Sequence, residues 1–273
     1  MKQLLKMHKP GFAIARLSIG SLIYLLFTCD QPSWGHQASN ILTSKIEKPL
    51  ALATAMRKSY SPPANPTPPN RTTGGGTRGG CDSPAAISLT ALAPQAHAGQ
   101  TASTWPTLTW YIADENPYPV QLQLYRYTSS NPVETQLERV HFFDLGPSQP
   151  GWMSFTLPTS LPPLNVGETY RWKVILQCSA SQPSKNKIDE ADLQVVPLPI
   201  GMVTTTDPVQ QAQQFAAAGL WYDAIAVISQ SSAASAVAYR RDLVASLAEL
   251  EAENPNDQFS QLSNRLRYIA TQD

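Results

Sequence analysis

The stretch that decides the fold is TYRWKVILQC, residues 169–178. Every second residue is apolar or a cysteine, in the series Tyr170, Trp172, Val174, Leu176 and Cys178. Side chains alternate between two faces along a β-strand, so this pattern predicts a strand with one apolar face. Cys178 is expected on that face, and Asn165 and Gly167 are expected to form the turn before the strand.

Similar short runs occur on both sides of this stretch, separated by clusters of Pro, Gly, Asn and Ser. The runs occupy residues 87–92, 107–112, 120–127, 134–143, 152–157 and 191–196. Seven short strands punctuated by turn residues are typical of a sandwich of two sheets. The sequence therefore predicts a mainly β domain over residues 81–200, an immunoglobulin-like antiparallel β-sandwich.

A helical pattern replaces the strand pattern in residues 207–273. Asp207 followed by Pro208 predicts a helix start, and Gly219 predicts its end. Further helices are expected over residues 221–229 and 235–253, and Asp257 is expected to cap a fourth. We expect these helices to form a small C-terminal tail.

Residues 1–35 have the pattern of a secretory signal peptide. Three lysines, Lys2, Lys6 and Lys9, precede an apolar run over residues 12–27, and small residues follow at Ser33 and Gly35. Export to the periplasm or the extracellular space is therefore expected. Two alternatives stay open: an uncleaved membrane anchor, and a lipoprotein modified at Cys29.

Residues 36–80 are polar and include the run SPPANPTPPNRTTGGGTRGG at residues 61–80. Proline favours extended chain and glycine adds flexibility, so this composition indicates a linker of low order.

Two cysteines, Cys81 and Cys178, remain once the leader is removed. Thiols in an oxidising compartment most simply pair, so we expect a disulfide between them; two buried free thiols are the alternative.

The charge balance argues against a nucleic-acid partner. Without residues 1–35 the chain keeps 16 basic and 19 acidic residues, a net charge of −3. Such a balance predicts no basic face for phosphate groups.

Chemistry-bearing residues are few and scattered. His97 and His141 lack the spacing of metal ligands, and Asp114 and Glu115 lie in an acidic turn without the spacing of a calcium loop. Ser184 and Lys187 match an S-x-x-K pattern but lack its companion motifs. The sequence therefore predicts no catalytic, cofactor-binding or metal-binding residue.

Aromatic residues are dense in the β region, where most are expected in the core. Tyr118, in a proline-rich loop, and Tyr125, out of phase with its apolar neighbours, are the best candidates for a binding surface. Trp221 and Tyr222 in the tail are weaker candidates.

Two resemblances follow from ordered motifs. Residues 212–230 resemble one helix hairpin of a tetratricopeptide repeat. The second resemblance rests on five motifs that follow one another along the chain. They are RGGC (78–81), LTALAP (89–94), a Trp-Pro pair (105–106), VGETYRWK (166–173) with a later Cys, and GLWYDAI (219–225). This series resembles a cyanobacterial exported family classed as a domain of unknown function. The resemblance implies a β-rich extracytoplasmic domain with a helical extension, and it implies no catalytic residue.

These observations favour an exported, non-catalytic module of the cell envelope that binds an envelope protein or a glycan. The alternative is an envelope hydrolase or other carbohydrate-active protein whose site is assembled from scattered residues such as His97, His141, Asp114 and Glu115. One cleft that held both histidines beside a serine or a carboxylate would favour the alternative, and histidines far apart on exposed loops would count against it.

Overall fold

The computed structural model describes residues 59–68, 81, 85–128 and 136–272. All of them belong to one compact unit, Thr54–Asp273. The predicted signal peptide and most of the predicted linker lie outside the described residues.

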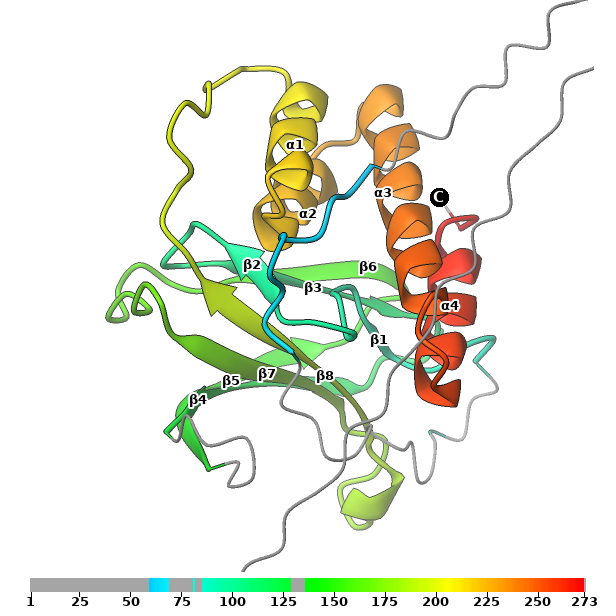
Figure 1. Ribbon diagram of the computed structural model, residues 1–273. Helices are drawn as coiled ribbons and strands as arrows, with labels where there is room; N and C mark the ends of the chain where they lie inside the picture. Colours follow the sequence, from blue (N-terminus) through cyan, green and yellow to red (C-terminus); the bar gives the residue numbers. More distant parts are fainter. Residues whose placement is uncertain (1–58, 69–80, 82–84, 129–135, 273) are drawn as a thin grey trace, which may run out of the picture. The chain divides into compact units, whose positions relative to one another are not determined.

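Eight strands form two sheets (Figure 1). The three-stranded sheet has the order β1-β3-β6, and the five-stranded sheet has the order β2-β8-β7-β4-β5. The strands are β1 (Thr90–Ala91), β2 (Gly99–Thr101), β3 (Thr107–Ile112), β4 (Pro119–Tyr127), β5 (Leu137–Pro147), β6 (Gly151–Thr156), β7 (Thr169–Leu176) and β8 (Lys187–Val195).

The predicted β-rich, two-sheet architecture is confirmed, with corrections to individual strands. Of the predicted run 87–92, only Thr90–Ala91 is strand, and β8 begins at Lys187 rather than at residue 191. The three-residue β2 was not predicted, because GQT has no apolar alternation. It pairs with β8 in parallel, so the sandwich is not antiparallel throughout.

Four helices follow the strands: α1 (Pro208–Ala217), α2 (Trp221–Ser229), α3 (Ala234–Ala252) and α4 (Asp257–Ile269). The Asp207 side chain accepts a hydrogen bond from the Val209 N–H and caps α1 as predicted. Gly219 adopts a positive φ of 80°, which suits a glycine that ends a helix. The cap of α4 is Asn256, not Asp257, because the Asn256 side chain accepts from the Gln258 N–H.

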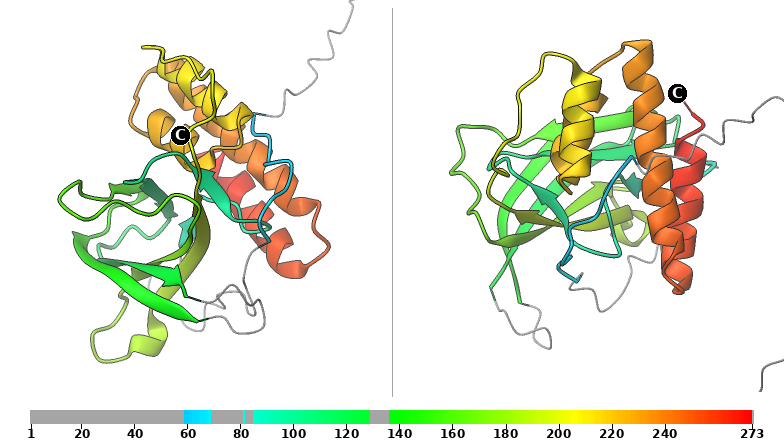
Figure 2. Two further views of the ribbon diagram at one scale, coloured as in Figure 1. Left: turned by 60° about the vertical axis from the view of Figure 1, so that its left-hand side comes forward. Right: turned by 45° about the horizontal axis from the view of Figure 1, so that its top comes forward.

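The helices share one hydrophobic core with the sheets, rather than forming a separate tail. Figure 2 shows them gathered on one side of the sheets, and α2 contacts β2 of one sheet and β3 and β6 of the other. On α3, Glu251 accepts hydrogen bonds from the backbone N–H groups of Gln95 and Ala96. Helices and sheets are therefore joined by buried polar contacts as well as by packing. The tetratricopeptide resemblance of the α1–α2 pair stays a prediction.

The predicted disulfide joins Cys81 to Cys178, with 4.7 Å between the two Cα atoms. The bridge is half-buried, because Cys178 lies two residues beyond the end of β7. It closes a loop with a sequence separation of 97 residues. Such a constraint on the unfolded chain stabilises a fold by on the order of 4 kcal/mol in the chain-entropy model.

Residues 59–68, here called the strap, correct the prediction of low order for that part of the linker. The strap leads from the helices to the neighbourhood of β2 (Figure 1). Its backbone is bonded at both ends: Ser61 N–H donates to the Ala216 carbonyl of α1, and the Thr67 carbonyl accepts from Ala98 N–H. Composition alone missed this, because the prolines that keep the strap extended are also typical of disordered linkers.

Tyr60 anchors the strap in the core. Its side chain is fully buried, and its ring meets the Trp221 ring edge-on with 5.0 Å between centroids. The Tyr60 hydroxyl lies 3.0 Å from Nε2 of His97. Burial, and secondarily the charge of Glu251, raise the pKa of Tyr60, so the phenol stays neutral.

We expect Tyr60→Ala to lower the free energy of unfolding by about 3–5 kcal/mol, because it leaves a cavity against Trp221. The measurement is urea unfolding of the chain from residue 36 onward. Asn65→Ala is the matched control, since Asn65 is an exposed residue of the same strap. Equal, small effects of both substitutions would contradict a structural role for the strap.

Candidate functional site

A group of four charged side chains lies on β7 and β8, on the sheet face opposite Trp172 and Val174. Arg171 faces Asp192 across the two strands, and Lys173 faces Glu190. Alternation along residues 169–178 predicts Arg171 and Lys173 together on the polar face of the strand, but it does not identify the partner carboxylates. Glu190 lies before residue 191, where the strand was expected to begin.

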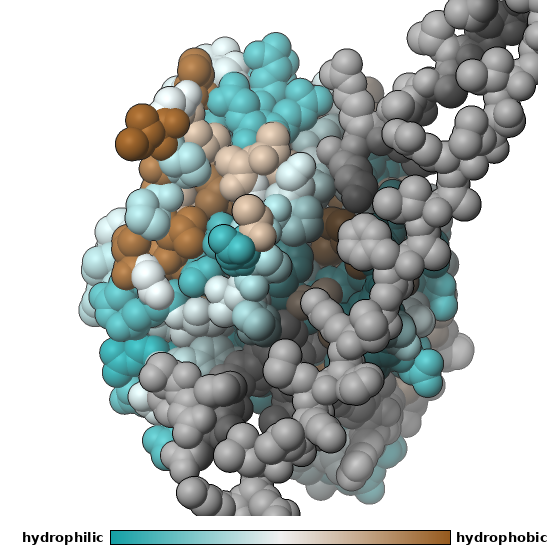
Figure 3. Space-filling model, in the orientation of Figure 1, coloured by the Kyte–Doolittle hydropathy of each residue, from teal (hydrophilic) through white to brown (hydrophobic). Residues whose placement is uncertain are grey.

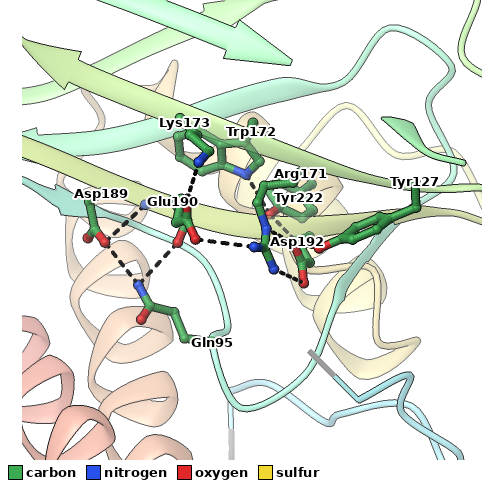
Figure 4. Close-up of polar contacts among 9 residues, drawn as sticks. All are labelled: Gln95, Tyr127, Arg171, Trp172, Lys173, Asp189, Glu190, Asp192 and Tyr222. Carbon is green, nitrogen blue, oxygen red and sulfur yellow. Dashed lines mark hydrogen bonds and ion pairs between the residues drawn. The ribbon is translucent and has the colours of Figure 1, made fainter. Parts of the chain in front are cut away.

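The four charges form a continuous network (Figure 4). Arg171 donates two hydrogen bonds to Asp192, from Nε to Oδ1 at 2.8 Å and from Nη2 to Oδ2 at 3.1 Å. Glu190 accepts from both cations, at 3.3 Å from Arg171 Nη1 and 2.9 Å from Lys173 Nζ. The Tyr127 hydroxyl donates to Asp192 at 2.9 Å. Arg171, Glu190 and Asp192 are each more than nine-tenths buried.

The electrostatics of this network favour fixed charges. Burial alone would lower the pKa of Arg171, but the hydrogen bond and the charge of Asp192 outweigh it and raise that pKa. Burial and the neighbouring Asp192 raise the pKa of Tyr127. Glu190 contacts Arg171 and Lys173, and Asp192 contacts Arg171, so the network holds β7 and β8 together.

The four candidate aromatic residues divide into two pairs. Tyr118 and Tyr125 are half-buried, and the Tyr125 ring lies 5.4 Å from the Lys173 ammonium. The prediction that placed Trp221 and Tyr222 on a surface is wrong, because both side chains are buried. They occupy the first turn of α2, and that turn enters the core.

His97 and His141 do not share a site. His97 is buried just before β2, whereas His141 lies on β5, at the other edge of the five-stranded sheet. β8, β7 and β4 separate those edges, a span of roughly 19 Å at the usual strand spacing. Burial lowers the pKa of both histidines. The two histidines are far apart, as expected without a hydrolase site, although His97 is buried and does not lie on an exposed loop.

The remaining sequence candidates are also accounted for. Asp114 is fully buried, and both of its carboxylate oxygens lie 3.0 Å from Lys187 Nζ. Lys187 is thus held in an ion pair with Asp114 and is not a partner for Ser184. Glu115 is exposed. Within the described ranges, no three His, Cys, Asp or Glu residues are grouped as a metal ion would need.

An apolar groove lies beside the connection from β8 to α1, residues 196–207. It measures about 460 Å³ and is lined by Leu198, Met202 and Val203 of the connection and by Phe215 and Val227 of the helices. Leu198 and Val203 are more than half exposed, and Ile200 is fully exposed. Figure 3 shows the apolar residues gathered along this side of the molecule.

Among the helices that the structure describes, none has the length and apolar character needed to cross a bilayer.

The buried His97 predicts a pH-dependent stability. Burial lowers its pKa to about 4, from an ordinary value of 6.5. The unfolded chain therefore takes up this proton first as the pH falls, and the stability present above pH 6.5 is lost progressively down to pH 4. Between pH 7.5 and pH 4.5 we expect a loss of about 2–3 kcal/mol from this residue. The measurement is urea unfolding across this range, in which His97→Gln should show a smaller loss than the wild type; parallel curves would contradict the assignment.

The buried ion network predicts a large effect for Arg171→Met. This substitution leaves the Asp192 and Glu190 carboxylates buried without the guanidinium, so the free energy of unfolding should fall by about 3–5 kcal/mol. Arg126→Met is the matched control: Arg126 pairs with Glu138 on the same sheet, but both side chains are exposed. Little change is expected there. A comparable loss in both variants, measured by chemical unfolding, would argue against a special role for the network.

Solved structures show limited similarity to this chain. The third fibronectin III domain of human KIAA0343 protein is 8% identical, with a TM-score of 0.24; the match covers 49% of this chain and 97% of that one. Spo0M, a sporulation control protein from Bacillus subtilis, is 21% identical with a TM-score of 0.21, over 39% of this chain and 45% of that one. Astrotactin-2, a vertebrate-specific, perforin-like membrane protein, is 12% identical with a TM-score of 0.27. That match covers 69% of this chain and 36% of the other.

No curated protein matches the sequence. A family match covers residues 73–240, which include all eight strands, α1, α2 and the first residues of α3. The chain therefore belongs to the family described as Domain of Unknown Function (DUF928).

Proposed function

We propose that this chain is an exported, non-catalytic module that binds another protein of the cell envelope. The observation that carries the proposal is the apolar surface of residues 196–206. Ile200 is fully exposed there, beside a groove lined by Phe215 and Val227. Contiguous apolar surface in contact with water is a typical mark of a protein-binding site.

The charge of this surface indicates the chemistry of the partner. Residues 193–206 contain no charged side chain, and the groove is lined by none. An anionic membrane surface is bound through Lys and Arg, which this surface lacks. The fitting partner is therefore a protein segment that presents two or three apolar side chains to the groove.

Export is supported by two independent features. The first is the signal-peptide pattern of residues 1–35. The second is the Cys81–Cys178 disulfide, which persists in an oxidising compartment. Among the described residues, nothing favours the hydrolase alternative, since its two histidines are apart and its Asp114 is held by Lys187.

The test is site-specific photo-crosslinking in intact cells of the source organism. A photoreactive amino acid at position 200 should give a crosslink to one defined envelope protein, whereas the same group at exposed position 213 of α1 should not. Adding Val203→Asp should reduce the crosslink roughly tenfold or more, because a carboxylate is costly to bury in an apolar interface.

Deletion of the helices would be a poor test, because they form part of the hydrophobic core. A crosslink only to a second copy of this chain or only to lipid would contradict the proposal, as would equal crosslinking from positions 200 and 213.

A further inference from the structure

A second cleft, of about 430 Å³, lies between residues 85–88, the start of β8 and α4. It shares no lining residue with the apolar groove. Its volume falls within the range typical of small-ligand sites. Its lining is mostly polar and includes Gln95, Asp189, Gln258, Gln261, Asn264 and Arg265.

The base of the cleft is rigid and buried. Gln95 is 2% exposed and Asp189 is 5% exposed. Asp189 accepts hydrogen bonds from Ala91 N–H at 2.9 Å and from the Gln95 amide at 3.3 Å. Arg265 of α4 donates from Nη1 to the Leu89 carbonyl at 3.0 Å and lies 3.5 Å from Asp189. These contacts fix α4 against β1 and β8 and hold the guanidinium in place.

The rim of the cleft is formed by amides on one face of α4. Gln258, Gln261 and Asn264 are spaced three residues apart, so their side chains project from neighbouring positions along the helix. Within the described part of the chain, the Gln258 and Gln261 side chains have no hydrogen-bond partner, and Arg265 uses only Nη1. The cleft therefore presents amide donors, amide acceptors and guanidinium donors that a ligand can use.

The charges of the cleft are balanced. Lys187 is paired with Asp114, and Arg265 is matched by Asp189. An anionic ligand that contacted Lys187 or Arg265 would therefore lie near a carboxylate as well, and a cationic ligand would lie near the Arg265 guanidinium. A neutral ligand suits the cleft better. Sugar hydroxyls both donate and accept hydrogen bonds, as side-chain amides do, so they can pair with several of these groups together.

We propose that this cleft binds a neutral saccharide of one or two sugar residues. Gln258 and Gln261 contact the hydroxyl groups, and Arg265, positioned by Asp189 and Leu89, supplies fixed donors. The inference goes beyond the proposed protein interaction and does not depend on it, because the two surfaces have no residue in common.

The test is titration of the isotope-labelled full mature chain with cellobiose, maltose and N,N′-diacetylchitobiose, followed by NMR. At least one sugar should shift the amide signals of residues 85–95 and 257–265. The double variant Gln258→Ala, Gln261→Ala should bind that sugar at least about tenfold more weakly, since several hydrogen bonds are lost. Gln213→Ala on α1 is the matched control, because it removes an exposed helical glutamine that does not line the cleft.

Three outcomes would overturn the assignment. They are no shift with any of the three sugars at their solubility limit, shifts that the double variant leaves unchanged, and stronger binding of inorganic phosphate or triglycine at the same residues. An unchanged melting temperature of the double variant shows that a loss of binding is not unfolding. Val203→Asp should leave saccharide binding intact, so failure of the protein interaction and failure of this inference are distinguishable.

Discussion

The fold depends on one constraint: the first turn of α2 must fill the space between the two sheets. Trp221 donates its indole N–H to the Leu92 carbonyl at 2.8 Å. The Tyr222 hydroxyl accepts from the Trp172 indole at 2.8 Å and donates to the Asp192 carbonyl at 3.0 Å. Each polar group that the two rings carry into the core therefore has a partner there, which makes the burial favourable. Close packing follows: a Cβ on Gly99 would lie 2.8 Å from the Tyr222 ring, so only glycine fits at that position of β2.

The same constraint explains what three of the sequence motifs contribute to the fold. LTALAP contributes Leu92, VGETYRWK contributes Trp172, and GLWYDAI contributes Gly219, Trp221 and Tyr222. These residues, far apart in the sequence, meet around the first turn of α2. The motifs therefore specify how the helices join the sandwich. Because a fold can present many different sites, the activity must be sought in surfaces that these motifs do not form.

β8 connects the surfaces for which we propose functions. Its first residues, Lys187 and Asp189, belong to the polar cleft, and its last residue, Val195, leads into the apolar connection. Between them, Glu190 and Asp192 are held by Arg171 and Lys173 of β7. A strand fixed by a buried ion network is a rigid support for a loop and a cleft at its two ends, and rigid support reduces the ordering cost when a ligand binds.

The sequence by itself determined the local structure. Alternation located β3, β4, β6 and β7 within one or two residues, and the Asp207 cap with Gly219 marked the limits of α1, because these signals depend on near neighbours in the chain. The Cys81–Cys178 pairing also followed from the sequence, since the third cysteine, Cys29, lies in the predicted signal peptide. Only the tertiary structure placed the rest. β2 is a strand because the edge of β8 is free to pair with it. The strap is ordered because Tyr60 packs against Trp221. Trp221 and Tyr222 are buried because the sandwich has an open side. Each of these outcomes rests on contacts between residues distant in the chain, which no local pattern records.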